Sequence, residues 1–277
     1  MEQKSNCATR YPILLVHGIG FRDSRVFNYW GRIPKALEQK GVMIFYGNQD
    51  SHGSVEDNAR ALQVRVREIL AQTGAEKVNI IAHSKGGLDV RWMISCMGES
   101  SHVASLTTIS TPHWGSRTVD LLLRLPDILV RMLSMCCDLW YRMLGDRHPN
   151  AYEVFHQLTT KRAVQFNAAV PDADGVYYQS YAFVMRRATG DMLMWLPYLV
   201  VKAVEGQSDG LVTPESAKWG NFRGVWTGRG RRGVSHCDEV DLRRRPLSRE
   251  THAVSNKIWD ITAFYCDLVA ELKQFGL

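Results

Sequence analysis

The sequence lacks a run of apolar residues long enough to cross a lipid bilayer. A membrane-spanning helix needs about 20 predominantly apolar residues in succession. The two most apolar stretches, residues 117–146 and 192–201, fall short of this. Asp127, Arg131 and Asp138 interrupt the first stretch, and the second is too short. The N-terminus also lacks an apolar core of the signal-peptide type. We therefore expect no integral membrane span, and either a cytoplasmic protein or a secreted one whose leader has been removed.

Cysteine is scarce, with 6 residues among 277, and the spacing has no metal-binding pattern. We expect reduced thiols, with one structural disulfide as the lesser alternative. A continuous basic stripe is also absent, because the net charge of +6 is accompanied by two local clusters, residues 228–233 and 242–246. No nucleic-acid-binding motif accompanies them, so nucleic acid is not an expected partner. A solvated surface is expected there, with contact to anionic lipid as the alternative.

Short apolar runs alternate with amphipathic stretches along the chain. This alternation is typical of a mostly parallel central sheet covered by helices, in the α/β class. No internal repeat, low-complexity tract or linker interrupts it, so residues 1–277 are expected to form a single domain. The expected strands cover residues 11–18, 42–47, 77–83, 103–111, 176–184 and 222–227, and the expected helices cover residues 54–74, 86–97 and 251–274.

Residues 117–146 depart from this alternation, because they are rich in Leu and Met. Pro126 divides them into two predicted amphipathic helices with wide apolar faces. Both an ordinary packed helical pair and a lid inserted over an apolar site would have this pattern. We favour the inserted lid because of the residues described next. Residues 192–201 are expected to line the same cleft or to contact an interface.

The apolar run at residues 78–83 ends in a serine flanked by small residues, in the stretch AHSKGG. A serine becomes nucleophilic when a base removes its proton and a tight strand-to-helix turn exposes it. The turn requires small residues two positions before and after the serine, and Ala82 and Gly86 meet this demand. Ser84 is therefore predicted to be a nucleophile. His83 is not expected to be its base, because neighbouring side chains on such a turn point in different directions.

Three motifs in this order, LLVHGIGF (14–21), AHSKGG (82–87) and ISTPHWGS (109–116), resemble those of bacterial triacylglycerol lipases of the α/β-hydrolase fold. The resemblance extends from about residue 11 to residue 125 and returns near residues 207–242. It implies the α/β-hydrolase fold with an inserted helical lid. It also implies that His17 and His113 belong to structural turns rather than to the catalytic machinery.

The resemblance further implies the chain order nucleophile, acid, histidine. The stretch DGLV makes Asp209 the expected acid, and SHCD makes His236 the expected base. Asp209 also follows an apolar stretch at a turn glycine, where a loop residue at a strand end is expected. His252 is the alternative base, but its neighbours predict the beginning of the final helix.

The oxyanion of the transition state needs two backbone N–H donors, each worth about 2.7–4 kcal/mol. The amide of Lys85, directly after the nucleophile, is expected to be one donor. The amide of Ile19, in the glycine-flanked loop after the first strand, is expected to be the other. The residues expected to bind the substrate are Phe21, Leu122, Leu133, Trp140 and Leu211.

A calcium site is a further implication of the resemblance. In several related lipases the aspartate two residues after the catalytic histidine, here Asp238, binds calcium and steadies the histidine loop. Asp191 is a candidate second ligand, because calcium prefers several oxygen ligands. The glutamine expected downstream is replaced by DLRRRP, so a salt bridge or hydrogen bond from Asp238 is the alternative.

The expected function is hydrolysis of carboxylic esters of acylglycerols through an acyl-enzyme, without a required cofactor. A lipid or ester substrate, met at a lipid–water interface, is the expected partner. The alternatives are a carboxylesterase or polyesterase, an acyltransferase or thioesterase with the same triad, and a non-catalytic binding protein on this fold. Covalent labelling by a fluorophosphonate separates the last alternative from the others.

Overall fold

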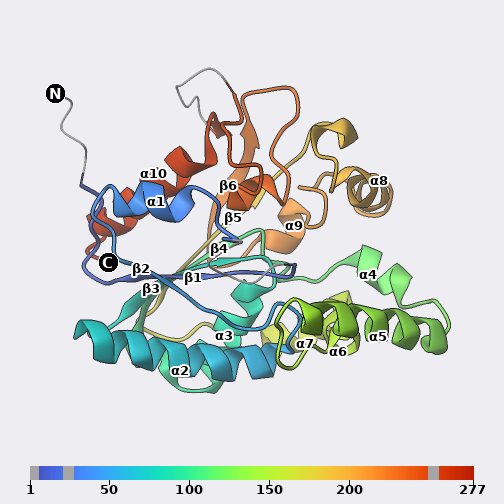
Figure 1. Cartoon of the computed structure of the whole chain (residues 1–277), viewed down its shortest axis with the longest axis horizontal. Helices are drawn as coiled ribbons and strands as arrows, with labels where there is room; N and C mark the ends of the chain where they lie inside the picture. Colours follow the sequence, from blue (N-terminus) through green and yellow to red (C-terminus); the bar gives the residue numbers. More distant parts are fainter. Residues whose placement is uncertain (1–5, 21–27, 249–255) are drawn as a thin grey trace.

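The computed structural model of the chain describes residues 6–20, 28–248 and 256–277. A sheet in the order β2-β1-β3-β4-β5-β6-β7 lies at its centre, and neighbouring strands are parallel throughout (Figure 1). This confirms the expected α/β class. The strands are Ile13–Val16 (β1), Ile44–Tyr46 (β2), Val78–His83 (β3), Val103–Ile109 (β4), Tyr177–Phe183 (β5), Asn221–Gly228 (β6) and Lys257–Ile258 (β7).

Helices cover both faces of the sheet (Figure 1). On β1, Ile13 and Leu15 face the core formed with α1 and α10, whereas Leu14 and Val16 face the core formed with α2 and α3. The apolar run of β1 is continuous because both of its faces are buried. The helices are Ile33–Glu38 (α1), Val55–Thr73 (α2), Gly86–Cys96 (α3), Arg117–Leu122 (α4), Asp127–Met143 (α5), Ala151–Gln157 (α6), Thr160–Ala169 (α7), Trp195–Val204 (α8), Pro214–Ala217 (α9) and Ile261–Gln274 (α10).

Local capping explains where the covering helices begin and end. The Ser54 side chain accepts a hydrogen bond from the Asp57 amide at the beginning of α2, and Gly74 ends the helix with φ +71°. The predicted helix over residues 251–274 is wrong at its beginning, because α10 begins only at Ile261. Asp260 caps that helix through the Thr262 amide, and Arg32 binds the same carboxylate at 2.9 and 3.0 Å. His252, the alternative base, lies outside the described residues.

The segment between β4 and β5 contains the two helices expected on either side of Pro126. Figure 1 shows α5 beside α6 and α7, away from the α1 and α10 side of the sheet. Within α5 only Val130 and Ser134 are buried, so a narrow stripe holds this helix against the rest of the molecule. Among the described residues, no helix combines the length and the apolar character that crossing a bilayer requires.

Candidate active site

Ser84 occupies a strained turn between β3 and α3. Its φ of +54° lies in the left-handed region, which a residue with a side chain adopts at an energetic cost. The Ser84 amide donates to the carbonyl of Ile109 at 2.9 Å, and the Thr111 hydroxyl donates to the Ser84 carbonyl at 2.7 Å. A Cβ on Gly86 would lie 2.4 Å from the carbonyl oxygen of His17. The small residue expected at this position is therefore needed for helix and strand to approach each other.

The structure brings Asp209 and His236 together from separate loops at the same edge of the sheet. His236 Nδ1 donates to Asp209 Oδ2 at 2.8 Å. The other oxygen, Asp209 Oδ1, accepts from the amides of Leu211 and Val212, both at 2.8 Å. Although burial raises the pKa of Asp209, the charge and hydrogen bond of His236 lower it further, so the pKa lies below its ordinary value. An ionised Asp209 keeps the proton of His236 on Nδ1, which leaves Nε2 able to accept a proton.

His83 lies beside this pair without being available as a base. Its ring centroid is 4.4 Å from that of His236, and its side chain is buried. Both of its nitrogens are engaged, Nδ1 with the Tyr29 hydroxyl at 2.7 Å and Nε2 with Glu239 Oε2 at 3.1 Å. Burial lowers the pKa of His83 well below its ordinary value. His83 is therefore a neutral ring that supports the loops around the site.

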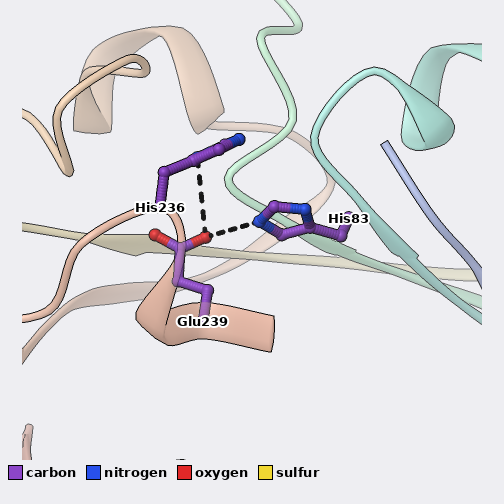
Figure 2. Close-up of side chains that lie close together, drawn as sticks. All are labelled: His83, His236 and Glu239. Carbon is purple, nitrogen blue, oxygen red and sulfur yellow. Dashed lines mark hydrogen bonds and ion pairs between the residues drawn. The ribbon is translucent and has the colours of Figure 1, made fainter. Parts of the chain in front are cut away.

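Glu239 is a second carboxyl group directly behind the Asp209–His236 pair. Its Oε2 lies 3.9 Å from His236 Nδ1, and Figure 2 shows it between the two histidine rings. The carboxylate of Asp209 lies near enough for its negative charge to act on Glu239. Burial and the charge of Asp209 raise the pKa of Glu239 well above its ordinary value. Of these two carboxyl groups, Glu239 is therefore the one that keeps its proton.

Hydrogen bonds also link Glu239 to the loop after β1. We assign the Tyr29 hydroxyl proton to Nδ1 of His83, so that Nε2 of the neutral His83 donates to Glu239. The Tyr29 oxygen then accepts from the Gly18 amide at 3.1 Å. The network thus connects Glu239 to the loop after β1.

The ligand atoms of His83, His236 and Glu239 lie within 4.8 Å of one another, a spacing that a metal ion could use (Figure 2). Each of these side chains already has a hydrogen-bond partner within the protein. We therefore interpret the cluster as a hydrogen-bonded network.

Substitution of Glu239 by glutamine is expected to change the pH dependence of stability. The unfolded chain releases this proton near pH 4.3, whereas the folded protein keeps it to higher pH. Below about pH 4.3 Glu239 is protonated in both the folded and the unfolded state, so its contribution to the free energy of unfolding is fully present. Above that pH the free energy of unfolding falls by about 1.4 kcal/mol per pH unit until the pH reaches the folded-state pKa. Glu239→Gln removes this loss, so the free energy of unfolding of the variant should rise relative to wild type between about pH 5 and 7. Urea denaturation at several pH values measures it, and a pH-independent difference would contradict a protonated Glu239.

The two amides predicted to bind the oxyanion belong to Lys85, directly after Ser84, and to Ile19, in the loop after β1. Lys85 is the N-cap residue of α3, where the first N–H groups have no partner within the helix. Its side chain is engaged elsewhere, because Nζ contacts Asp89 at 2.6 Å in the buried interior. Ile19 follows Gly18, and a Cβ on Gly18 would lie 2.6 Å from the Ser84 Cβ. The loop after β1 therefore passes directly over the serine.

An apolar cavity of about 290 Å³ opens beside His236. Ile19 and Leu211 line it, as do Leu193 and Met194 from the apolar stretch predicted to line the cleft. Leu122, Leu133 and Trp140, which were expected to bind the substrate, do not lie in its wall; they are exposed to solvent on α4 and α5. Phe21 lies outside the described residues.

The candidate calcium ligands Asp191 and Asp238 lie close together, although they are far apart in the sequence. Both are buried, and Arg243 contacts both of them, at 3.7 Å from Asp191 and through two hydrogen bonds to Asp238. The side chains that would face a calcium ion therefore already face a guanidinium group.

Two residues of the site, Tyr29 and Glu239, were not among the sequence candidates. Glu239 carries a weak signal in the sequence, because it is an acidic residue three positions after His236. Tyr29 carries none, since nothing local indicates that its hydroxyl would lie between the loop after β1 and His83.

The chain is similar to known hydrolases. Residues 12–227 match the family described as palmitoyl protein thioesterase. Triacylglycerol lipase 2 of Saccharomyces cerevisiae is 30% identical over 90% of this chain and 74% of its own length. A triacylglycerol lipase of Pseudarthrobacter phenanthrenivorans is 32% identical, and this match covers 60% of this chain and 56% of that lipase. The relatives thus include a yeast protein, so the similarity is not restricted to bacterial lipases.

Solved structures show the same fold at low sequence identity. A metagenomic carboxyl esterase superposes with a TM-score of 0.73 and 17% identity, over 96% of this chain and 76% of that one. Staphylococcus hyicus lipase superposes with a TM-score of 0.66 and 17% identity, over 98% of both chains. The predicted α/β-hydrolase fold is therefore confirmed.

Proposed function

Because this chain belongs to the palmitoyl protein thioesterase family and is an α/β-hydrolase enzyme related to triacylglycerol lipases, we propose that it cleaves acylglycerol esters through Ser84, His236 and Asp209. The observation that supports this proposal most is the 2.8 Å bond between His236 and an ionised Asp209, beside a strained serine turn and an apolar cavity. A non-catalytic protein on this fold would have no need to retain this arrangement.

The proposed reaction proceeds in two steps. The Ser84 hydroxyl attacks the ester carbonyl while its proton moves to Nε2 of His236, and the amides of Ile19 and Lys85 stabilise the oxyanion. His236 then returns the proton to the leaving alcohol, which leaves an acyl-enzyme. Water, deprotonated by the same nitrogen, attacks the acyl carbonyl, and the fatty acid leaves as Ser84 regains its proton.

The exposed face of α4 and α5 supports a lipid substrate. Large apolar side chains between residues 121 and 144, here called the apolar platform, are exposed to solvent in a nearly continuous series. The exposed residues Met192, Leu193, Trp195 and Leu196 add a second apolar surface at the beginning of α8, which packs against α4. A soluble protein rarely exposes so much apolar surface without a partner. We propose that it rests on lipid and that α4 and α5 form the lid.

Acidic substitutions on the apolar platform are expected to separate lipid from soluble substrates. Met135 and Met143 are 70% and 74% exposed, so Met135→Asp/Met143→Asp should fold normally. Its rate on emulsified triacylglycerol should fall at least about tenfold, because burying each methionine is worth about 1.5–3 kcal/mol. Its rate on a soluble p-nitrophenyl ester should stay within about twofold of wild type.

The matched control is Val64→Asp, since Val64 is a 58% exposed apolar residue on α2, outside the apolar platform. Rates are measured with esters of graded chain length, below and above their solubility limit. An equal loss on both classes of substrate, or an equal loss in the Val64 variant, would contradict the lipid-contact role.

Thioester hydrolysis is the second candidate, and the family match over residues 12–227 favours it. The same triad would attack a thioester carbonyl and release a thiol in place of an alcohol. Matched oxyester and thioester substrates with the same acyl chain distinguish the two, and a higher kcat/KM for the thioester would replace the lipase proposal.

A further inference from the structure

One arginine side chain occupies the space between two buried aspartates beside the histidine loop. Arg243 Nε donates to Asp238 Oδ1 at 2.7 Å, and its Nη2 donates to Asp238 Oδ2. Nη2 also lies 3.7 Å from Asp191 Oδ2. On the third side, Nη1 donates to the Gly190 carbonyl at 2.9 Å. The guanidinium group thus contacts two carboxylates and one backbone carbonyl, which are the ligand types that calcium prefers.

The oxygen atoms of these aspartates are already in use. Asp191 Oδ2 accepts from the Ser235 hydroxyl at 2.6 Å, and Oδ1 accepts from the Leu193 amide at 2.9 Å. Asp238 Oδ2 accepts from the Ser235 amide at 3.2 Å in addition to Arg243. A calcium ion here would have to displace a guanidinium group that is itself tied to the chain. The residues present therefore do not fit calcium.

Electrostatics favour the arrangement that the structure shows. Asp191 and Asp238 are buried, so two negative charges at this place need a positive partner. Burial lowers the pKa of Arg243, but the hydrogen bond and charge of Asp238 and the charge of Asp191 outweigh it and raise the pKa overall. The planar guanidinium group binds one carboxylate through two nitrogens, which fixes direction as well as distance.

Ser235 connects Asp191 and Asp238 to His236, the proposed base. Ser235, which precedes His236, donates its hydroxyl to Asp191 and its amide to Asp238. The Asp238 amide donates back to the Ser235 hydroxyl at 3.1 Å. His236 lies within this closed turn, and its own amide donates to the Asp209 carbonyl at 2.9 Å. The position of the His236 ring therefore depends on the segment that Arg243 holds in place.

We propose that Arg243 is a built-in cation that holds the histidine loop against Gly190 and Asp191, in place of the calcium of related lipases. Arg243 is then a positioning residue that acts through His236, and catalysis needs no added divalent cation. This inference rests on the proposed function, because it takes His236 as the general base. A covalently attached cation cannot be removed by a chelator, which makes the two arrangements distinguishable.

The test compares wild type, Arg243→Ala and Arg243→Lys with a soluble p-nitrophenyl ester. Wild-type kcat should be the same with EGTA and with millimolar calcium. In Arg243→Ala, kcat should fall about 10–100-fold, the usual effect of losing a group that orients a reactive residue, with KM within about threefold. Millimolar calcium or guanidinium ion should restore part of that kcat, because Asp191 and Asp238 then lack a cation. Arg243→Lys should be intermediate, since lysine keeps the charge and loses the two-nitrogen contact.

The matched control is Arg223→Ala. Arg223 forms an ion pair with Glu271 and is 31% exposed, against 21% for Arg243. Its loss should lower the melting temperature without changing kcat or the response to calcium. If Arg243→Ala does not fold, Arg243→Lys carries the test alone, and a wild-type kcat in that variant counts against the proposal.

Three results would overturn the inference. They are loss of wild-type activity in EGTA with recovery in calcium, an unchanged kcat in Arg243→Ala, or a loss of kcat that neither calcium nor guanidinium restores. Failure of the proposed function is distinct from these, because it would appear as full activity after removal of the Ser84 hydroxyl.

Discussion

Replacing Ser84 by alanine is expected to reduce ester hydrolysis by about four to six orders of magnitude. Without the hydroxyl group no acyl-enzyme forms, and His236 has no nucleophile to deprotonate. The oxyanion amides and the cavity remain, so a small residual rate above the uncatalysed reaction should persist. The variant should also relieve strain at the φ of +54° only slightly, because alanine still carries a Cβ. Initial rates with p-nitrophenyl esters measure the loss.

The control for this variant is Ser95→Ala on α3. Ser95 donates its hydroxyl to the Pro171 carbonyl at 2.6 Å, so the substitution also removes one serine hydrogen bond. It should leave the rate within about twofold of wild type. Labelling by a fluorophosphonate should be complete in wild type and Ser95→Ala and absent in Ser84→Ala. Unchanged turnover in Ser84→Ala would disprove the serine mechanism.

Replacing Asp209 by asparagine is expected to lower kcat by about 10⁴. The carboxylate keeps the proton of His236 on Nδ1 and stabilises the imidazolium that forms during the reaction. The amide of asparagine can instead donate to Nδ1, which moves the ring proton to Nε2, the nitrogen that must accept the proton of Ser84. Because KM reflects the cavity rather than the tautomer, the loss should appear in kcat.

Two further variants test whether the loss of kcat is specific to Asp209. Asp146→Asn alters another buried aspartate, which accepts from the backbone amides of Ser51 and His52 at 3.1 and 2.8 Å, and it should lower stability while changing kcat by less than about threefold. Glu239→Gln should change kcat by about tenfold at most, since glutamine has nearly the shape of the protonated acid and is likewise uncharged. A Glu239→Gln loss as large as that of Asp209→Asn would instead identify Glu239 as the ionised partner of His236.

Much of the scaffold was predictable, because it depends on neighbours in the sequence. The apolar run at residues 78–83 predicted β3, and the small residues around Ser84 predicted the turn that the positive φ shows. Ser54 and Gly74 marked the ends of α2. The motifs then indicated which loops carry Asp209 and His236, and the structure brings these two side chains into contact.

The beginning of α10 and the orientation of α5 were not predictable in this way. Arg32 holds the residue that caps α10, and no local pattern indicates so distant a partner. The sequence predicted wide apolar faces on residues 117–146, but an amphipathic pattern has the same appearance whether the face contacts protein or solvent. Only the structure places most of that face in solvent.

By itself the sequence determined the sheet, its covering helices and the turn at Ser84, because periodicity and steric demand act over a few residues. Only the tertiary structure decided that Glu239 lies between His83 and His236, where burial and the charge of Asp209 raise its pKa, and that Arg243 lies between Asp191 and Asp238. Both depend on burial, which makes a nearby charge or proton obligatory, and on distances between loops that come together only when the sheet has formed.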